Sequence, residues 1–264
     1  MGFMYSTFHA IIGPRLMCHA QKEGVVPTIS FIQPKGGAGK STSALILALE
    51  LAKGASTTLI DADPNAPIVK WQARGGRADN LTVIEADRER SIFDQIEAAE
   101  TQTAFVVVDT EGVADLRAAH AISASDLVLV PSQGSALDQD NAARAIKLIR
   151  DQERPMRRTI PHAVLLTRVS AAIQSRGLKA AEQQLVEHGV DVFETRLIER
   201  EAFKALFSFN TTLDELGPED VSGLERARDN AIAFTAEVVR RLKALSGQGA
   251  AAAGRRTADA RARA

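Results

Sequence analysis

A segment near the N-terminal end combines lysine, glycine and hydroxyl residues, the types that bind phosphate. It reads Lys35-Gly36-Gly37-Ala38-Gly39-Lys40-Ser41-Thr42. Glycines in such a turn let the backbone N–H groups close on a ligand, because no side chain stands in the way. A helix that begins directly after the turn adds the positive end of its dipole. Lys40 can then supply a charge for the terminal phosphates, and the Ser41 hydroxyl is a suitable ligand for Mg²⁺.

Two later segments place a carboxylate directly after an apolar run. The first reads Asp61-Ala62-Asp63-Pro64-Asn65, and the second is Asp109, which follows Phe105–Val108. Phosphoryl transfer needs a metal ion that neutralises charge and a group that positions the attacking water. Acids at these positions suit both tasks, although a single acid at the end of a strand is also a common solvated side chain.

Apolar runs and amphipathic segments alternate from about Pro27 onward, and they predict the elements that position these groups. The runs are continuous rather than alternating, which is typical of a parallel sheet covered on both faces. We therefore expect a doubly wound α/β fold with helices on both faces, which binds ligands at the carboxyl ends of its strands. The predicted strands are Thr28–Gln33, Thr57–Asp61, Leu81–Ala86, Phe105–Asp109, Asp126–Val130, His162–Thr167 and Val190–Leu197, and the predicted helices are Ser41–Lys53, Ile92–Ala99, Leu137–Arg150 and about Asp220–Leu245.

Length and composition indicate one large domain. The chain has 264 residues, of which 45% are hydrophobic, and its formal net charge is -1. We expect the domain to occupy residues 26–245, between a disordered extension at 1–25 and a disordered Ala/Gly/Arg-rich tail at 246–264. One cysteine, Cys18, excludes a disulfide framework and a multi-cysteine metal site within the chain. No apolar run approaches the roughly 18 residues that span a bilayer.

The loop departs from the general G-x-x-x-x-G-K-[ST] pattern, because Pro34 occupies the first glycine position and Lys35 follows it. In this form it resembles the deviant Walker A motif of the ParA/MinD superfamily of P-loop ATPases. The segment Asp61–Asn65 resembles the D-x-D-P-Q switch of ParA proteins, with Asn65 where glutamine is commoner. The resemblance covers about 26–245 and is closest to short plasmid-type ParA partition proteins. A ParA-like protein of conjugative DNA transfer systems is also similar, in Leu197–Leu216.

The resemblance implies ATP with Mg²⁺ at this site. Asp63 would orient the attacking water, Asp109 would act on Mg²⁺ through water, and Asp61 would support the metal shell. The segment that ends in Thr167 and Arg168 looks like the one that borders adenine, although Arg168 could equally be an ordinary surface arginine. No N-K-x-D element for guanine follows the loop, which favours ATP over GTP.

The resemblance also implies partners. Lys35 would reach the phosphates of a second subunit in an ATP-bound homodimer; the alternative is that it acts in cis or faces solvent. Nonspecific DNA and a ParB-like activator are the expected partners, and the expected location is cytoplasmic, with nucleoid association when ATP is bound. Basic residues on the last predicted helix and the tail would contact DNA, unless they form a solvated face: Arg226, Arg228, Arg240, Arg241, Lys243, Arg255, Arg256, Arg261 and Arg263.

Two other functions stay open. A MinD-like membrane-cycling ATPase is one, but its anchor needs bulky apolar residues near the C-terminus, and only Ala, Gly and polar residues follow Leu245. A metabolic phosphotransferase is the other, and it would consume ATP only with a small acceptor.

Overall fold

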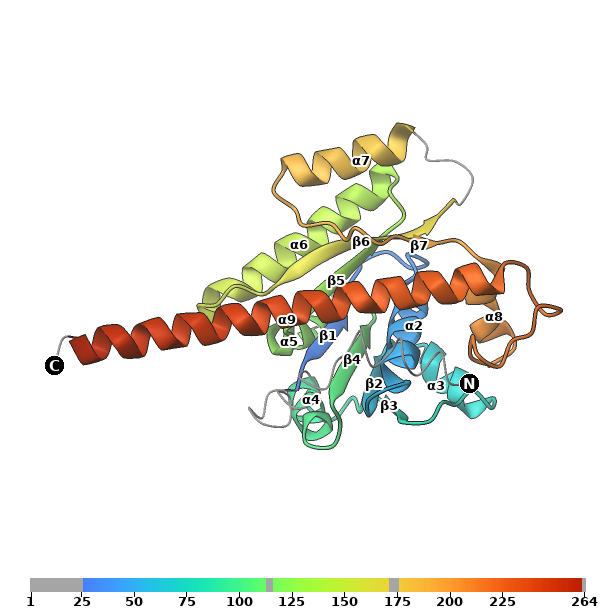
Figure 1. The fold of residues 1–264 in the computed structure, drawn as a ribbon, viewed down its shortest axis with the longest axis horizontal. Helices are drawn as coiled ribbons and strands as arrows, with labels where there is room; N and C mark the ends of the chain where they lie inside the picture. Colours follow the sequence, from blue (N-terminus) through green and yellow to red (C-terminus); the bar gives the residue numbers. More distant parts are fainter. Residues whose placement is uncertain (1–25, 113–115, 171–175, 263–264) are drawn as a thin grey trace.

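The computed structural model describes residues 26–112, 116–170 and 176–262. Within these ranges, seven parallel strands form a sheet in the order β3-β2-β4-β1-β5-β6-β7 (Figure 1). The strands are β1 (Thr28–Phe31), β2 (Thr57–Ala62), β3 (Leu81–Glu85), β4 (Phe105–Thr110), β5 (Leu127–Ser132), β6 (His162–Val169) and β7 (Leu197–Ile198). The helices are α2 (Lys40–Ala52), α3 (Pro67–Ala73), α4 (Ile92–Glu100), α5 (Leu116–Ala124), α6 (Ala136–Met156), α7 (Arg176–Glu187), α8 (Glu201–Ser208) and α9 (Leu224–Ala262).

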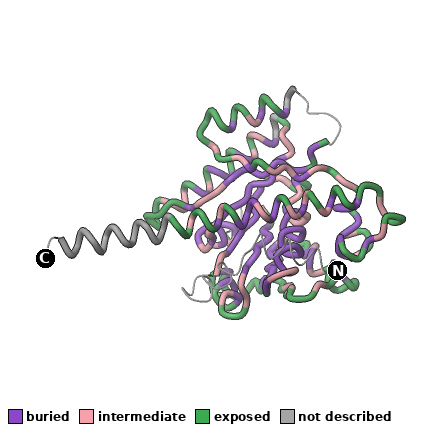
Figure 2. Tube along the Cα trace, in the orientation of Figure 1, coloured by how far each residue is buried: buried purple, intermediate pink, exposed green. Residues whose placement is uncertain are grey.

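Continuous apolar strands supply core to both faces of this sheet, as the sequence predicts. In β4, Val107 packs into the cluster that includes α2, α8 and α9. Its neighbours Val106 and Val108 pack on the other face, in a cluster with α4 and α5. A third cluster lies between β5, β6 and the helices α5, α6 and α7. The central strands are therefore buried along their whole length (Figure 2), and the predicted doubly wound α/β fold is confirmed.

The strand register brings the candidate site residues to one edge of the sheet. Strand β1 lies between β4 and β5, so the connections on its two sides lead away in opposite directions. Asp61 on β2 is paired with Asp109 on β4, and Asp109 is paired with Phe31 at the end of β1. The loop after β1 therefore meets both acids at the crevice where doubly wound sheets bind ligands.

The C-terminal helix is longer than predicted. Helix α9 continues to Ala262, where the sequence predicts a helix that ends near Leu245 and a disordered tail from 246. Alanine and arginine are among the best helix formers, and they dominate the added stretch. The predicted extension at 1–25 lies outside the described residues. The predicted strand Val190–Leu197 is mostly wrong, because only an isolated bridge at Val192 and the two residues of β7 pair with β6.

Helix α3 is anchored to the body of the protein by Trp71, the chain's single tryptophan. Its side chain is 1% exposed, and Nε1 donates a hydrogen bond to the carbonyl oxygen of Thr211 at 3.2 Å. Gly76 closes over the ring so tightly that a Cβ there would lie 2.3 Å from Cε2 of Trp71. Only glycine fits at position 76 unless the tryptophan moves.

Candidate functional site

The glycine-rich loop between β1 and α2 presents free N–H groups. Gly37 and Gly39 have φ angles of +80° and +88°, which side-chain-bearing residues rarely adopt. Gly39 precedes α2, and no side chain caps the first turn of that helix. The N–H groups of Gly36, Gly37 and Gly39 have no acceptor among the described residues. Uncapped donors at a helix N-terminus attract anions.

Backbone carbonyl oxygens of the same loop accept hydrogen bonds from side chains in β6 and directly after β5. Gln133 donates from Nε2 to the carbonyl oxygen of Gly37 at 2.7 Å, and Arg168 donates from Nη1 to the same oxygen at 3.2 Å. The Thr167 hydroxyl donates to the carbonyl oxygen of Ala38 at 2.7 Å. Thr167 and Arg168 therefore support the loop directly, a contact that the sequence did not predict.

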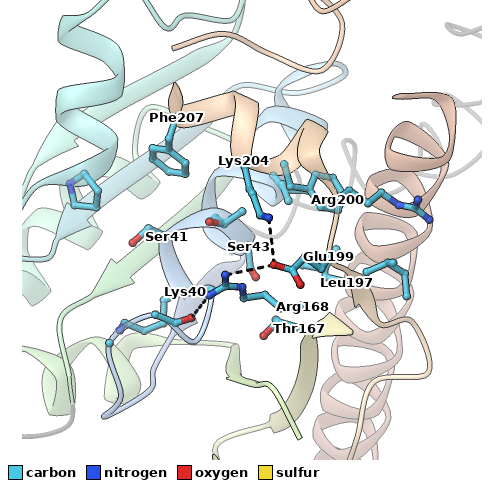
Figure 3. Close-up of a pocket in the computed structure, with 18 of the residues that line it drawn as sticks. Lys40, Ser41, Ser43, Thr167, Arg168, Leu197, Glu199, Arg200, Lys204 and Phe207 are labelled. Atoms are coloured by element: carbon cyan, nitrogen blue, oxygen red, sulfur yellow. Dashed lines mark hydrogen bonds and ion pairs between the residues drawn. The ribbon is translucent and has the colours of Figure 1, made fainter. Parts of the chain in front are cut away.

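A cavity of about 530 Å³ opens beside the loop, and Figure 3 shows its lining. One wall consists of the loop and the start of α2, including Lys40, Ser41 and Thr42. Asp63 and Asn65 line a second part. The third part is the β7–α8 segment, which sequence reasoning did not assign to the site: Leu197, Ile198, Glu199, Arg200, Phe203, Lys204 and Phe207.

The β7–α8 wall is tied to β6 by charge pairs. Glu199 accepts from Arg168 at 3.4 Å and lies 3.4 Å from the Nζ of Lys204 (Figure 3). The signal that could have located this wall is topological, because β7 is a parallel strand and its carboxyl end must point to the same edge as the others. A two-residue strand gives little periodicity from which to infer this.

Asp109 is the least satisfied polar group at the site. It is fully buried, and among the described residues neither of its carboxylate oxygens has a hydrogen-bond partner. Burial raises the pKa of Asp109 to about 7, and Asp61 and Asp63 add to the rise. Lys40 and the Ser41 hydroxyl, which lies nearby without meeting hydrogen-bond geometry, oppose it. A buried carboxylate without donors is costly unless a cation meets it. The corner that Asp109 and Ser41 share therefore fits a divalent cation.

The donor set suits Mg²⁺ in particular. Mg²⁺ is commonly held by one or two protein oxygens, with water and substrate phosphates completing its shell. Among the described residues, no group of three or more His, Cys, Asp or Glu side chains is placed to hold a metal. Asp109 and Ser41, beside a phosphate-binding loop, match a Mg²⁺ site with few protein ligands rather than one enclosed by protein ligands alone.

The acids of the Asp61–Asn65 segment have different surroundings. Asp61 is buried, and its Oδ2 accepts from the N–H groups of Ile68 and Val69 at 2.8 and 3.0 Å. Burial raises the pKa of Asp61, and these backbone bonds oppose the rise. Asp63 faces the cavity, where its Oδ1 accepts from the backbone and side-chain nitrogens of Asn65 at 2.8 and 3.0 Å. Asp61 thus holds the first turn of α3 in place, which the sequence did not indicate.

The two lysines of the loop point to different places. Lys40 is 8% exposed and lines the cavity. Lys35 is not part of the lining; its Nζ lies 2.8 Å from Oδ1 of Asp138 in the same chain. Ser135 and Asp138 form the capping box that begins α6. Burial alone would raise the pKa of Asp138, but the bonds from Lys35 and Ser135 hold it below its ordinary value.

Most of the basic side chains predicted to contact DNA on α9 have partners within the chain. Arg228 donates to the carbonyl oxygens of Leu213 and Leu216. Arg241 bonds Glu237 and stacks 4.3 Å above the ring of Phe193.

Three other basic side chains on α9 were also predicted to contact DNA, and the structure describes them. Arg240 pairs with Glu194 at 3.2 Å, Lys243 also has a partner, and Arg226 is exposed. The side chains of Arg255, Arg256, Arg261 and Arg263 lie outside the described residues. No helix of the described chain is long and apolar enough to cross a membrane.

Comparison with known proteins places this geometry in a family. The sequence model of the family described as VirC1 protein matches residues 26–216, which is well over half of the chain. The chain belongs to the VirC1 family. This VirC1-family chain is 38% identical over 218 residues to protein ParA of Rhizobium radiobacter, a match that covers 82% of the chain and 98% of that protein. It is 30% identical over 184 residues to protein virC1 of Rhizobium rhizogenes, covering 67% and 79%.

Solved structures share the fold of this VirC1-family chain. A Cyanothece McdA variant in complex with ATP superposes with a TM-score of 0.64 at 17% identity, covering 84% of this chain and 96% of that one. MinD of Aquifex aeolicus superposes with a TM-score of 0.61 at 17% identity, covering 83% and 98%. The family match and the shared fold confirm the predicted place in the ParA/MinD superfamily, close to plasmid ParA and virC1.

Proposed function

We propose that this chain is an ATP- and Mg²⁺-dependent switch ATPase that partitions DNA or positions another cargo. One observation carries the proposal. Free loop N–H groups and Lys40 face a cavity beside Asp109, a buried carboxylate that no donor of the described residues satisfies. A solved McdA relative binds ATP, and a solved MinD relative binds Mg-ADP. A triphosphate with Mg²⁺ would meet both the donors and the carboxylate.

Each residue then has a definite task in hydrolysis. The loop from Lys35 to Thr42, with Lys40, binds the phosphates, and Ser41 and Asp109 hold Mg²⁺, which neutralises charge during phosphoryl transfer. Asp61 supports this corner from behind by fixing α3. Asp63 faces the cavity and orients the attacking water.

Lys35 gives the nucleotide its role as a switch. We propose that ATP brings two subunits face to face and that Lys35 leaves Asp138 to reach the phosphates of the second subunit. Hydrolysis then releases the dimer. In this proposal the ion pair with Asp138 belongs to the separate subunit and is given up when the dimer forms.

We further propose that the ATP-bound dimer binds DNA nonspecifically, in the cytoplasm and on the nucleoid, and that a DNA-binding ParB-like protein stimulates hydrolysis. Similarity to protein ParA supports this assignment. A relative named for maintenance of carboxysome distribution, 30% identical over 167 residues, supports positioning of a cargo as the general task.

Light scattering with a non-hydrolysed ATP analogue and Mg²⁺ tests the switch. The wild-type chain should double in mass, and Lys35→Ala should stay monomeric while it still binds the analogue. Lys147→Ala is a matched control, because Lys147 is an exposed lysine far from the loop in sequence. A Lys35→Ala protein that dimerises like wild type would show that Lys35 does not act across subunits.

A further inference from the structure

The outer face of α6 carries a row of basic side chains. Arg144, Lys147, Arg150 and Arg154 recur every three or four residues, so they lie on one side of the helix, and all four are exposed. The opposite side is buried against the sheet and consists of Ala142, Ala145, Ile146 and Ile149. We call the four exposed residues the α6 basic row.

Most of the charge in the α6 basic row is not neutralised by residues that the structure describes. Arg144, Arg150 and Arg154 make no ion pair with any residue that the structure describes. Lys147 pairs with Asp151 at 2.6 Å, an exposed pair of the kind that contributes little to stability.

The charge balance of the surrounding stretch is also positive. Residues 140–158 contain six basic and three acidic side chains. The basic ones are Arg144, Lys147, Arg150, Arg154, Arg157 and Arg158, and the acidic ones are Asp140, Asp151 and Glu153.

The contrast with α9 is direct. Arg228, Arg240 and Arg241 on α9 are engaged by carbonyl oxygens, carboxylates and an aromatic ring. The arginines of the α6 basic row make no ion pair with the described residues, although the charge of Arg154 acts on nearby Asp151. Per turn of helix, α6 therefore carries more unpaired positive charge than the described part of α9, the helix that the sequence predicts to contact DNA.

We propose that the α6 basic row is the surface that binds the phosphate backbone of double-stranded DNA, without reading its sequence. This inference rests on the proposed nonspecific DNA binding and says which face performs it. From Arg144 to Arg154 the row runs about 15 Å, which matches roughly four base pairs of duplex. Three arginines and a lysine at one-turn intervals meet phosphates along that length.

The row does not suit insertion into a lipid surface. An interfacial helix needs bulky apolar residues beside its charges. The apolar side chains of α6 are turned into the core, and Met156, 37% exposed, lies beyond the end of the row.

The test compares two triple variants in the full-length protein. Arg144→Gln, Arg150→Gln and Arg154→Gln remove the unpaired charges of the row, and Arg226→Gln, Arg240→Gln and Lys243→Gln remove the same charge from α9. Binding to a random-sequence duplex is measured with the ATP analogue and Mg²⁺ across a salt series.

The α6 variant should bind about tenfold more weakly or worse, and the slope of log affinity against log salt should be shallower by up to about 0.9 per lost contact. The α9 variant should stay within about threefold of wild type.

Controls separate the possible failures. Analogue-induced dimerisation and basal ATP hydrolysis of the α6 variant should equal those of wild type, which shows that it is folded. If the wild type itself does not bind the duplex, the proposed DNA function fails, and the inference fails with it. If the wild type binds and the α6 variant binds equally well, or if the α9 variant is the one that loses binding, only the inference is overturned. Wild-type binding to anionic vesicles but not to the duplex would replace DNA with membrane.

Discussion

The two sides of the cavity differ in how well their polar groups are satisfied. On the β6–β7 side, Thr167 and Arg168 donate hydrogen bonds to the loop, and Arg168 also pairs with Glu199. On the phosphate side, Asp109 accepts no hydrogen bond and Lys40 makes no ion pair with any residue that the structure describes.

The difference indicates which side the ligand completes. Unsatisfied buried groups raise the free energy of the empty site, so a ligand that meets them gains affinity from their relief. The paired side is a preformed support that a ligand leaves largely unchanged. Substitutions on the phosphate side should therefore change chemistry and affinity, whereas loss of the already paired charge on Asp138, outside the cavity, should change only the balance between subunit states.

Asp63→Ala should have the largest effect on the phosphate side. Removal of the group that orients water should slow hydrolysis by about 10²- to 10⁴-fold, while ATP still binds and dimer accumulates. Single-turnover hydrolysis and light scattering measure the two quantities. Asn65→Ala is the control, because it removes the partner of Asp63 and leaves the carboxylate. If Asp63→Ala hydrolysed ATP at the normal rate, another residue would have to orient the attacking water.

Asp109 should make the nucleotide-free protein sensitive to pH. Its folded-state pKa of about 7 lies above the ordinary value of 3.8, so the folded state holds its proton to higher pH than the unfolded chain does. Stability should therefore fall as pH rises from about 4 to about 7, by up to about 4 kcal/mol for this group.

Asp109→Asn should remove that fall and be the more stable protein at pH 8. Urea unfolding at pH 5 and pH 8 measures the difference. The same variant should bind the nucleotide less tightly in Mg²⁺, because the amide cannot carry the negative charge. Equal pH dependence in the two proteins would mean that Asp109 titrates normally.

Lys40→Ala should weaken nucleotide binding by about 10- to 100-fold, since a hydrogen bond to a charged group is worth about 1.5–3 kcal/mol. Isothermal titration with the ATP analogue measures the loss. The control is Lys53→Ala, at the other end of the same helix and paired with Glu50. Unchanged affinity in Lys40→Ala would remove this lysine from the phosphate site.

Asp138→Asn tests a paired charge outside the cavity, the partner of Lys35, and should have the smallest effect. The variant loses the charge that holds Lys35, so the ATP concentration needed for half-maximal dimerisation should fall by about two- to fivefold, in line with a partly exposed ion pair. Asparagine can still accept from the Ser135 N–H, which preserves the helix cap. A higher requirement for ATP would mean that Asp138 assists assembly instead.

The sequence predicts the parts of this molecule that depend on local pattern. The loop 35–42 and the strands that end at Asp61 and Asp109 are recognisable because glycines, lysines and continuous apolar runs are local signals. The contact of Lys35 with Asp138 depends on how distant segments pack, and that of Asp61 with Ile68 on how the turn between them folds back, so no spacing in the sequence indicates either. The helices α3, α5 and α8 were not predicted, and their seven to nine residues give a weak period. The twelve-residue α7 was also missed, although its buried Leu178, Ala181 and Leu185 recur at helical spacing.

The prediction of a DNA-binding α9 shows the same limit. Its arginines lie off the apolar stripe, as the periodicity indicates, but periodicity does not show that Arg228 and Arg241 meet acceptors from other elements. A basic residue on a helix face is available to a partner only if the fold leaves it so.

The anchoring of α3 also has an experimental consequence. Trp71 is the chain's sole indole fluorophore, and it is shielded from water on the helix whose first turn Asp61 holds. Its emission wavelength and its access to an aqueous quencher therefore report on one helix alone. A stopped-flow record of that emission, in unlabelled protein, would time any movement of α3 relative to phosphate release.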